Sequence, residues 1–186
     1  MTTTTLIIVV IIAIVVVAAV AWFVLRQQRS KRLRSHFGPE YERAVHEFGD
    51  RPKAEEALRA RQKRMEKFHI HSLSGQERDR FAGQWHDVQA RFVDDPAGSI
   101  READRLVCDV MTARGYPMSD FERRAEDLSV DHPDVVRNFR AAHNIALKHE
   151  GGQASTEDLR RALVYYRDLF DELLEAHTMG SREIKR

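Results

Sequence analysis

The chain contains very little cysteine: a single residue, Cys108, in 186. One thiol can form neither an intrachain disulfide nor a zinc site built from several cysteines, so domains stabilised in either way are excluded. No Cys-His-Asn pattern of a thiol enzyme accompanies it. We therefore interpret Cys108 as a small buried hydrophobe rather than a nucleophile.

The short motifs that mark common catalytic sites are also missing. The sequence has no HExxH zinc motif, no glycine-rich phosphate loop, no GxSxG nucleophile turn and no DxDxDG calcium loop. Enzyme classes that depend on these motifs have no support, and we predict no catalytic residue, cofactor or metal site. Alternation of apolar and polar residues over a useful length is missing as well, which argues against β-strands.

Charge is absent from one long stretch. Residues 6–25, LIIVVIIAIVVVAAVAWFVL, carry no charged side chain. Twenty helical residues span about 30 Å, which is the thickness of the hydrocarbon core of a bilayer. In lipid, a single segment can satisfy its backbone hydrogen bonds only as a helix. We therefore predict that residues 1–25 form an N-terminal transmembrane anchor that crosses the membrane once.

The flanks of this segment predict its orientation. Trp22 and Phe23 are expected at the membrane–water interface, where aromatic side chains are enriched. The first five residues carry no side-chain charge, whereas the juxtamembrane segment 26–38 carries five basic residues. These are Arg26, Arg29, Lys31, Arg32 and Arg34. Positive flanks stay in the cytoplasm, so we expect the N-terminus outside and the following domain in the cytoplasm.

The apolar segment has two other possible interpretations. Ala19-Val20-Ala21 has the small-x-small form of a signal-peptidase site, so the segment could be a cleaved signal and the remainder an exported protein. The run is long for a signal and no basic residue precedes it, which favours the uncleaved anchor. A buried helix of a soluble protein is disfavoured because no polar stripe interrupts the run.

The remainder is predicted to be all-α, with about seven helices in a soluble domain over residues 39–178 and a polar tail over 179–186. Helix-start signals occur at Pro39, Pro52, Ser74 with Glu77, Pro96, Ser119 with Glu122, Pro133 and Thr156. The expected ends are near Gly49, Phe68, Val93, Gly115, Leu128 and Gly151. Apolar residues at helical spacing predict core faces, for example Phe81, Trp85, Val88 and Phe92.

The turn before Pro133 is expected to be a structural joint between two helices. Pro133 favours an extended conformation at His132. Asp131 is expected to accept backbone N–H groups of the following helix, as a capping residue does. Asp134 would lie in the first helical turn, where the helix dipole favours a negative charge.

Histidines form the few polar clusters in the sequence that could bind a metal ion or take part in catalysis. His69-Ile70-His71 places two imidazoles close together, but a metal site needs further ligands from rigid elements. His143 and His177 lie on or beside apolar stripes, which is typical of packed histidines. If the protein is an enzyme, we expect it to use His69, His71 or the Asp131-His132 turn.

The charge distribution is more informative than the net charge of +1. Residues 26–38 carry a net charge of +5 and residues 51–71 carry +4, whereas residues 72–186 carry −5. Basic residues near the bilayer attract anionic lipid headgroups. The basic helix after Pro52 is expected to face either lipid or solvent. Nucleic acid is not an expected partner, because the domain as a whole is not basic.

Four segments resemble a family of uncharacterised bacterial proteins with one N-terminal membrane helix. They are FGPEYERAV (37–45), QARFVDDPAGSIREADRLV (89–107), RGYPMSDFERRAEDLSVDHPDVVRNFRAAHNIA (114–146) and TEDLRRALVYYRDLFDELL (156–174). The resemblance implies an all-helical domain attached to a membrane helix, in a bacterium of high GC content. It implies no activity, cofactor or catalytic residue.

These observations favour a single-pass protein of the bacterial inner membrane whose cytoplasmic domain binds another protein as a scaffold or adaptor. The alternatives are a membrane-bound enzyme of unrecognised type and an exported helical protein with a cleaved signal.

Overall fold

The fold is entirely helical over the part of the chain that can be described. A computed structural model describes residues 3–175, with side chains from Ile11 onward, and no strand occurs in that range. The helices are α1 (Thr3–Phe37), α2 (Pro39–Phe48), α3 (Arg51–Met65), α4 (Gly75–Arg91), α5 (Pro96–Ala113), α6 (Phe121–Asp131), α7 (Pro133–Glu150) and α8 (Thr156–Glu175). The predicted class, one apolar helix followed by seven others, is confirmed. His177 and the tail 179–186 lie outside the described residues.

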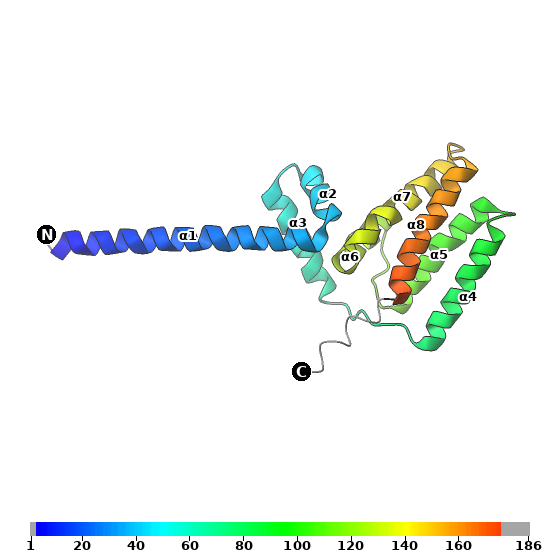
Figure 1. The fold of residues 1–186 in the computed structure, drawn as a ribbon, viewed down its shortest axis with the longest axis horizontal. Coiled ribbons are helices and arrows are strands. Elements are labelled where there is room, and N and C mark those ends of the chain that lie inside the picture. Colours follow the sequence, from blue (N-terminus) through cyan, green and yellow to red (C-terminus); the bar gives the residue numbers. More distant parts are fainter. Residues whose placement is uncertain (1–2, 176–186) are drawn as a thin grey trace.

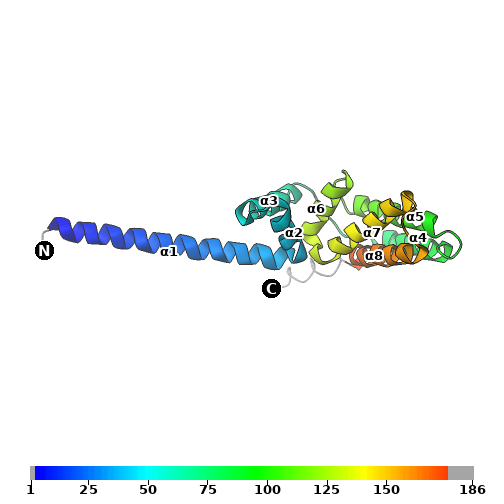
Figure 2. The same ribbon diagram turned by 90° about the horizontal axis from the view of Figure 1, so that it is seen from above.

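Helix α1 is the dominant feature of the shape. Its 35 residues extend for about 50 Å, and its N-terminal part stands clear of the remaining helices in both ribbon views (Figures 1 and 2). Every described side chain from Ile11 to Leu25 is exposed. The helix is long and apolar enough to span a membrane. Since none of the described elements covers this apolar surface, it is not a core helix of the domain.

The same helix continues without a break into the folded domain. Leu33 and Phe37, in its last turns, are buried against α2 and α3. They form a small cluster with Tyr41, Ala44, Ala54 and Leu58. The basic segment after Leu25 is therefore helical, and its inner face belongs to the packing of the domain.

A larger core lies farther from α1. Helices α4, α5, α7 and α8 pack side by side, and α6 lies between this bundle and α3 (Figures 1 and 2). Trp85 of α4 stacks on Phe170 of α8 with ring centroids 4.7 Å apart. Phe139 of α7 meets Tyr166 of α8 edge to face at 6.2 Å. Aromatic pairs in these arrangements add to the stabilisation that comes from burial.

Most predicted helix starts are correct, and the differences have local causes. The capping box of Ser74 and Glu77 is present at the start of α4. Asp120, rather than Ser119, caps α6 by accepting the backbone N–H of Arg123, because a carboxylate reaches this donor at the preferred position. Helix α6 also continues to Asp131, three residues beyond the expected end at Leu128.

The C-terminal turns of α1 are attached to α3 through one carboxylate. The hydroxyl groups of Ser30 on α1 and Tyr41 on α2 donate to Oε1 of Glu55, at 2.5 and 3.1 Å, and Arg59 donates to Oε2 at 2.8 Å. Burial raises the pKa of Glu55, but these hydrogen bonds and the Arg59 charge outweigh burial and hold the pKa below its usual value. Glu55 therefore joins three helices as a carboxylate.

This arrangement predicts a pH-dependent contribution to stability. Because the folded-state pKa of Glu55 lies below the unfolded value, its carboxylate stabilises the fold above about pH 4.5 and loses this effect as the pH falls through the folded-state pKa. Glu55→Gln should therefore lower the melting temperature of the full-length protein in detergent most at neutral pH, and the difference from wild type should shrink in acid. The exposed neighbour provides a control, since Glu56→Gln should change little at any pH. A difference for Glu55→Gln that stays constant from pH 7 to 3 would contradict this assignment.

Candidate functional site

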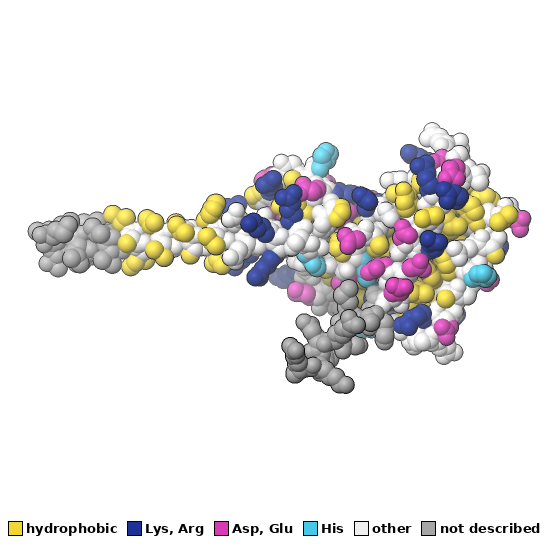
Figure 3. Space-filling model, viewed as in Figure 1, with side chains coloured by type: hydrophobic (Ala, Val, Ile, Leu, Met, Phe, Trp, Pro, Cys, Tyr) yellow, Lys and Arg dark blue, Asp and Glu magenta, His cyan; other side chains and the backbone are white. Residues whose placement is uncertain are grey.

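The predicted interfacial residues lie where α1 leaves its apolar stretch. Trp22 and Phe23 are 62% and 63% exposed, and the guanidinium of Arg26 lies over the Trp22 ring at 5.4 Å. Figure 3 shows basic side chains gathered at the base of α1, next to the apolar helix. All five predicted basic residues of the flank are exposed, and Arg34 forms an ion pair with Glu42 at 2.9 Å. The apolar stretch of α1 is therefore followed directly by five exposed basic residues, which we call the collar: Arg26, Arg29, Lys31, Arg32 and Arg34.

A second group of charges, which the sequence did not reveal, lies at the junction of the two cores, and its members Glu40, Arg61 and Arg140 are buried. The carboxylate of Glu40 on α2 is 2% exposed and faces Arg61 of α3 at 3.7 Å and Arg140 of α7 at 3.5 Å. Arg61 also bonds to Glu126 of α6 at 3.2 Å, and Arg140 bonds to Glu122 of the same helix. We call these five residues the junction ion cluster.

Arg64 extends the contact between α3 and α6. Its Nε donates to Asp127 at 2.7 Å, and its guanidinium reaches Glu126 at 3.2 Å. The sequence predicts that Arg61 and Arg64 face lipid or solvent, but in the structure both contact α6. The burial of Arg61 could have been predicted from the sequence. At helical spacing Arg61 shares a face with Ala54, Leu58 and Met65, and these three residues are buried.

A cavity of about 750 Å³ lies at the same junction. Its wall includes His69, Asp131 and His132, so three of the residues named for an enzyme come together there. His71 does not line it: its backbone pairs with that of Arg114, at 2.9 Å from the His71 N–H to the Arg114 carbonyl. The chain approaches so closely here that Gly115, at φ +89°, has no room for a Cβ, which would lie 2.5 Å from the carbonyl oxygen of His69.

The polar side chains of this cavity are bonded to one another. Nδ1 of His132 lies 3.0 Å from Glu172, and Nε2 lies 3.4 Å from a guanidinium nitrogen of Arg114, which can only donate. In the neutral tautomer His132 therefore donates to Glu172 and accepts from Arg114. The same nitrogen of Arg114 also donates to the carbonyl of Leu173 at 3.2 Å. These bonds hold the ends of α5, α6 and α8 together and leave no free ring nitrogen on His132.

Asp131 does not cap α7, and that prediction is wrong. Asp131 is the last residue of α6, and its carboxylate accepts the hydroxyl of Tyr116 at 2.9 Å. His132 takes the capping position without a side-chain hydrogen bond, because its ring faces Glu172 and Arg114. Burial raises the pKa of Tyr116 and the nearby Asp131 charge raises it further, so the phenol stays protonated and donates. Asp134 does lie in the first turn of α7 as expected.

The remaining candidates are packing residues in the structure. Cys108 is half-buried on α5, and burial raises its pKa to about 11, which keeps the sulfur as an unreactive thiol. The ring of His143 stacks on Phe121 with centroids 3.6 Å apart, and burial lowers its pKa. Within residues 3–175, no three His, Cys, Asp or Glu side chains are placed to hold a metal ion, and the rings of His69 and His71 lie 6.3 Å apart.

Comparison of the chain with known proteins found no matching family model, no matching curated protein and no matching solved structure.

The junction ion cluster generates a stability prediction. Glu40→Gln removes the carboxylate shared by Arg61 and Arg140, and both guanidinium groups stay buried with only one carboxylate partner each. We expect the free energy of unfolding to fall by about 2–3 kcal/mol. Urea unfolding of the full-length protein in detergent, followed by circular dichroism, measures this change.

A matched control removes a carboxylate from the same helix. Glu42 pairs with Arg34 at the surface, where an ion pair contributes about 0–1 kcal/mol, so Glu42→Gln should change stability little. Equal unfolding midpoints for Glu40→Gln and Glu42→Gln would show that the cluster does not hold the two cores together.

Proposed function

We propose that this protein is a single-pass protein of a bacterial inner membrane, with its helical domain in the cytoplasm, and that the domain acts as a scaffold or adaptor for another protein. The observation that carries this proposal is the continuity of α1. One helix presents a bare apolar surface over residues 11–25 and, without a break, buries Leu33 and Phe37 in the domain. A domain attached in this way is held at a fixed position relative to the bilayer.

The orientation is supported by the collar. Five exposed basic side chains follow the apolar stretch, and the positive-inside rule directs that flank to the cytoplasm. The proposed location in a bacterial inner membrane is supported by a resemblance to bacterial proteins with a single membrane helix. The resemblance lies in residues 37–45, 89–107, 114–146 and 156–174.

A binding role is supported by how the polar groups of the domain are used. The junction ion cluster and the hydrogen bonds around His132 hold helices together, and Cys108 is an unreactive thiol. The part of the chain after residue 71 carries a net charge of −5, which gives a partner charged helix faces to recognise.

The second candidate is a membrane-bound enzyme centred on the junction cavity. One observation favours it: residues far apart in the sequence, His69, Asp131 and His132, line one cavity of about 750 Å³. For such an enzyme His132 would have to release Arg114 or Glu172 before one of its ring nitrogens could take part in proton transfer.

The topology proposal predicts the outcome of reporter fusions. Green fluorescent protein fused after Arg186 should fluoresce in the bacterial host, and alkaline phosphatase fused at the same place should be inactive, because the fusion point lies in the cytoplasm. As a control, replacing the five collar residues by Gln should weaken this bias. Phosphatase activity of the wild-type fusion without fluorescence would place the domain outside and support the exported protein.

The scaffold proposal predicts a specific protein partner. Capture from detergent-solubilised membranes with the full-length protein should recover a partner that the α1 segment fused to an unrelated domain does not recover. Because the proposed contact uses charged helix faces, raising the salt concentration well above physiological should release it. Failure to recover any such partner, together with turnover of a small molecule that depends on His132, would favour the enzyme instead.

A further inference from the structure

A groove runs between α1 and α3 at the level where α1 leaves its apolar stretch. Its outer part, about 370 Å³, is lined on α1 by Trp22, Leu25, Arg26 and Arg29 and on α3 by Arg59. Its inner part, about 520 Å³, continues along α1 past Arg29, with Arg59 again on the opposite wall. Arg29 and Arg59 border both parts, so they mark the centre of the groove. We refer to it as the α1–α3 groove.

The lining of the groove changes from apolar near the membrane-spanning stretch to charged farther along α1. A phospholipid changes in the same direction, from its acyl chains to its headgroup. Trp22 and Leu25 form the apolar end, next to the membrane-spanning stretch. Arg29 lies four residues beyond Leu25, which is about 6 Å along a helix. The headgroup region of a bilayer extends about 5–8 Å beyond the hydrocarbon on each side. Arg29 therefore lies at the depth of lipid phosphates when the apolar stretch spans the hydrocarbon.

The charge of the groove suits an anion. Arg26, Arg29, Arg32 and Arg59 border it, against one carboxylate, Glu55. Glu55 is already bonded to Ser30, Tyr41 and Arg59. Among residues 3–175, neither Arg29 nor Arg32 forms an ion pair, so both guanidinium groups are available. Arginine binds phosphate through two parallel N–H donors, which gives geometric selectivity as well as charge.

We propose that the α1–α3 groove binds the headgroup phosphate of an anionic phospholipid from the cytoplasmic leaflet, with the acyl chains lying along Trp22 and Leu25. The inference rests on the membrane anchoring proposed above. A zwitterionic lipid fits less well, because its ammonium group would enter a groove with a net positive charge. The lipid would touch both α1 and α3, and so add to the contacts that already hold α1 against the domain.

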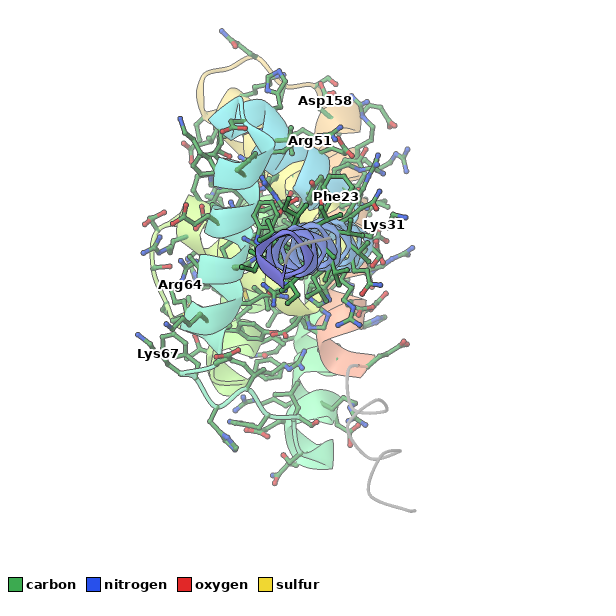
Figure 4. All side chains as sticks on the ribbon, turned by 90° about the vertical axis from the view of Figure 1, so that its left-hand side faces the viewer. Phe23, Lys31, Arg51, Arg64, Lys67 and Asp158 are labelled. Atoms are coloured by element: carbon green, nitrogen blue, oxygen red, sulfur yellow. The ribbon has the colours of Figure 1, made fainter. Side chains whose placement is uncertain are left out.

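The rival explanation is a general attraction between the collar and an anionic surface, in which each charge acts alike wherever it lies on the helix. The chain provides a matched residue that separates the two. Lys31 carries the same charge in the same collar but lies on the side of α1 away from α3 (Figure 4) and does not line the groove. A site requires Arg29 and Arg59 to matter more than Lys31.

Tryptophan fluorescence tests the proposal on the full-length protein in phosphatidylcholine vesicles that contain a minor fraction of phosphatidylglycerol. Bromine, which quenches tryptophan on contact, is placed on the acyl chains of one lipid or the other. Trp85 is 5% exposed and stacked on Phe170, so it gives a constant background and Trp22 reports the lipids at the groove. Wild type should show phosphatidylglycerol enriched around Trp22 about fivefold or more over its bulk fraction.

The variants give the decisive comparison. Arg29→Gln and Arg59→Gln should each lower this enrichment to below twofold, Arg29→Lys should give an intermediate value, and Lys31→Gln should stay close to wild type. Equal losses for Arg29→Gln and Lys31→Gln, or no enrichment in wild type, would overturn the site while leaving the anchor intact. Quenching by neither brominated lipid would mean that α1 is not in the bilayer, and would overturn the anchoring and the site together.

Discussion

The carboxylate of Glu40 connects the two halves of this protein. It is buried between Arg61 of α3 and Arg140 of α7, and these arginines bond in turn to Glu126 and Glu122 of α6. Removing the buried members Glu40, Arg61 and Arg140 from water costs several kcal/mol per ion, so these charges stabilise the fold only while each of them has its partner. The cluster therefore favours one relative position of the two cores, the position in which its opposite charges meet. Apolar contacts alone would allow the two cores to slide against each other.

That position determines how α1, α2 and α3 are placed relative to the bundle. Through Glu55, the last turns of α1 are bonded to α2 and α3. Through Glu40, α2 forms ion pairs with Arg61 of α3 and Arg140 of α7, and these two arginines in turn contact α6. Each connection uses a buried or half-buried polar group whose partners lie on different helices. The apolar helix, the collar and the bundle are therefore parts of one continuous body, and the α1–α3 groove and the junction cavity are the spaces left where its helices diverge.

The junction cavity shows why clustering of histidine and acidic residues does not by itself indicate catalysis. His132 lies within hydrogen-bond distance of both Glu172 and Arg114, and Arg114 also donates to the carbonyl of Leu173, but these bonds fix the ends of different helices. Tyr116 and Asp131 are paired in the same way. A catalytic histidine needs a ring nitrogen directed at a substrate, and here both nitrogens are directed at the protein. The arrangement supports a structural role, in keeping with the proposed scaffold.

The sequence alone determined the features that depend on local chemistry. Signals of this kind act over a few residues only, so they predict one apolar helix and seven others without knowledge of the fold. Examples are the uncharged run of residues 6–25, the prolines Pro39 and Pro133 at helix starts, and the capping box at Ser74.

The prediction for Asp131 is wrong because a turn offers its carboxylate two kinds of hydrogen-bond donor. Only the tertiary position of Tyr116, fifteen residues away, decides between them. The ion cluster, the cavity and the groove likewise depend on residues that are far apart in the sequence, such as Glu40 with Arg140 and Arg29 with Arg59. Their charges look like ordinary solvated helix faces in the sequence, and packing alone shows which of them lose water and meet a partner.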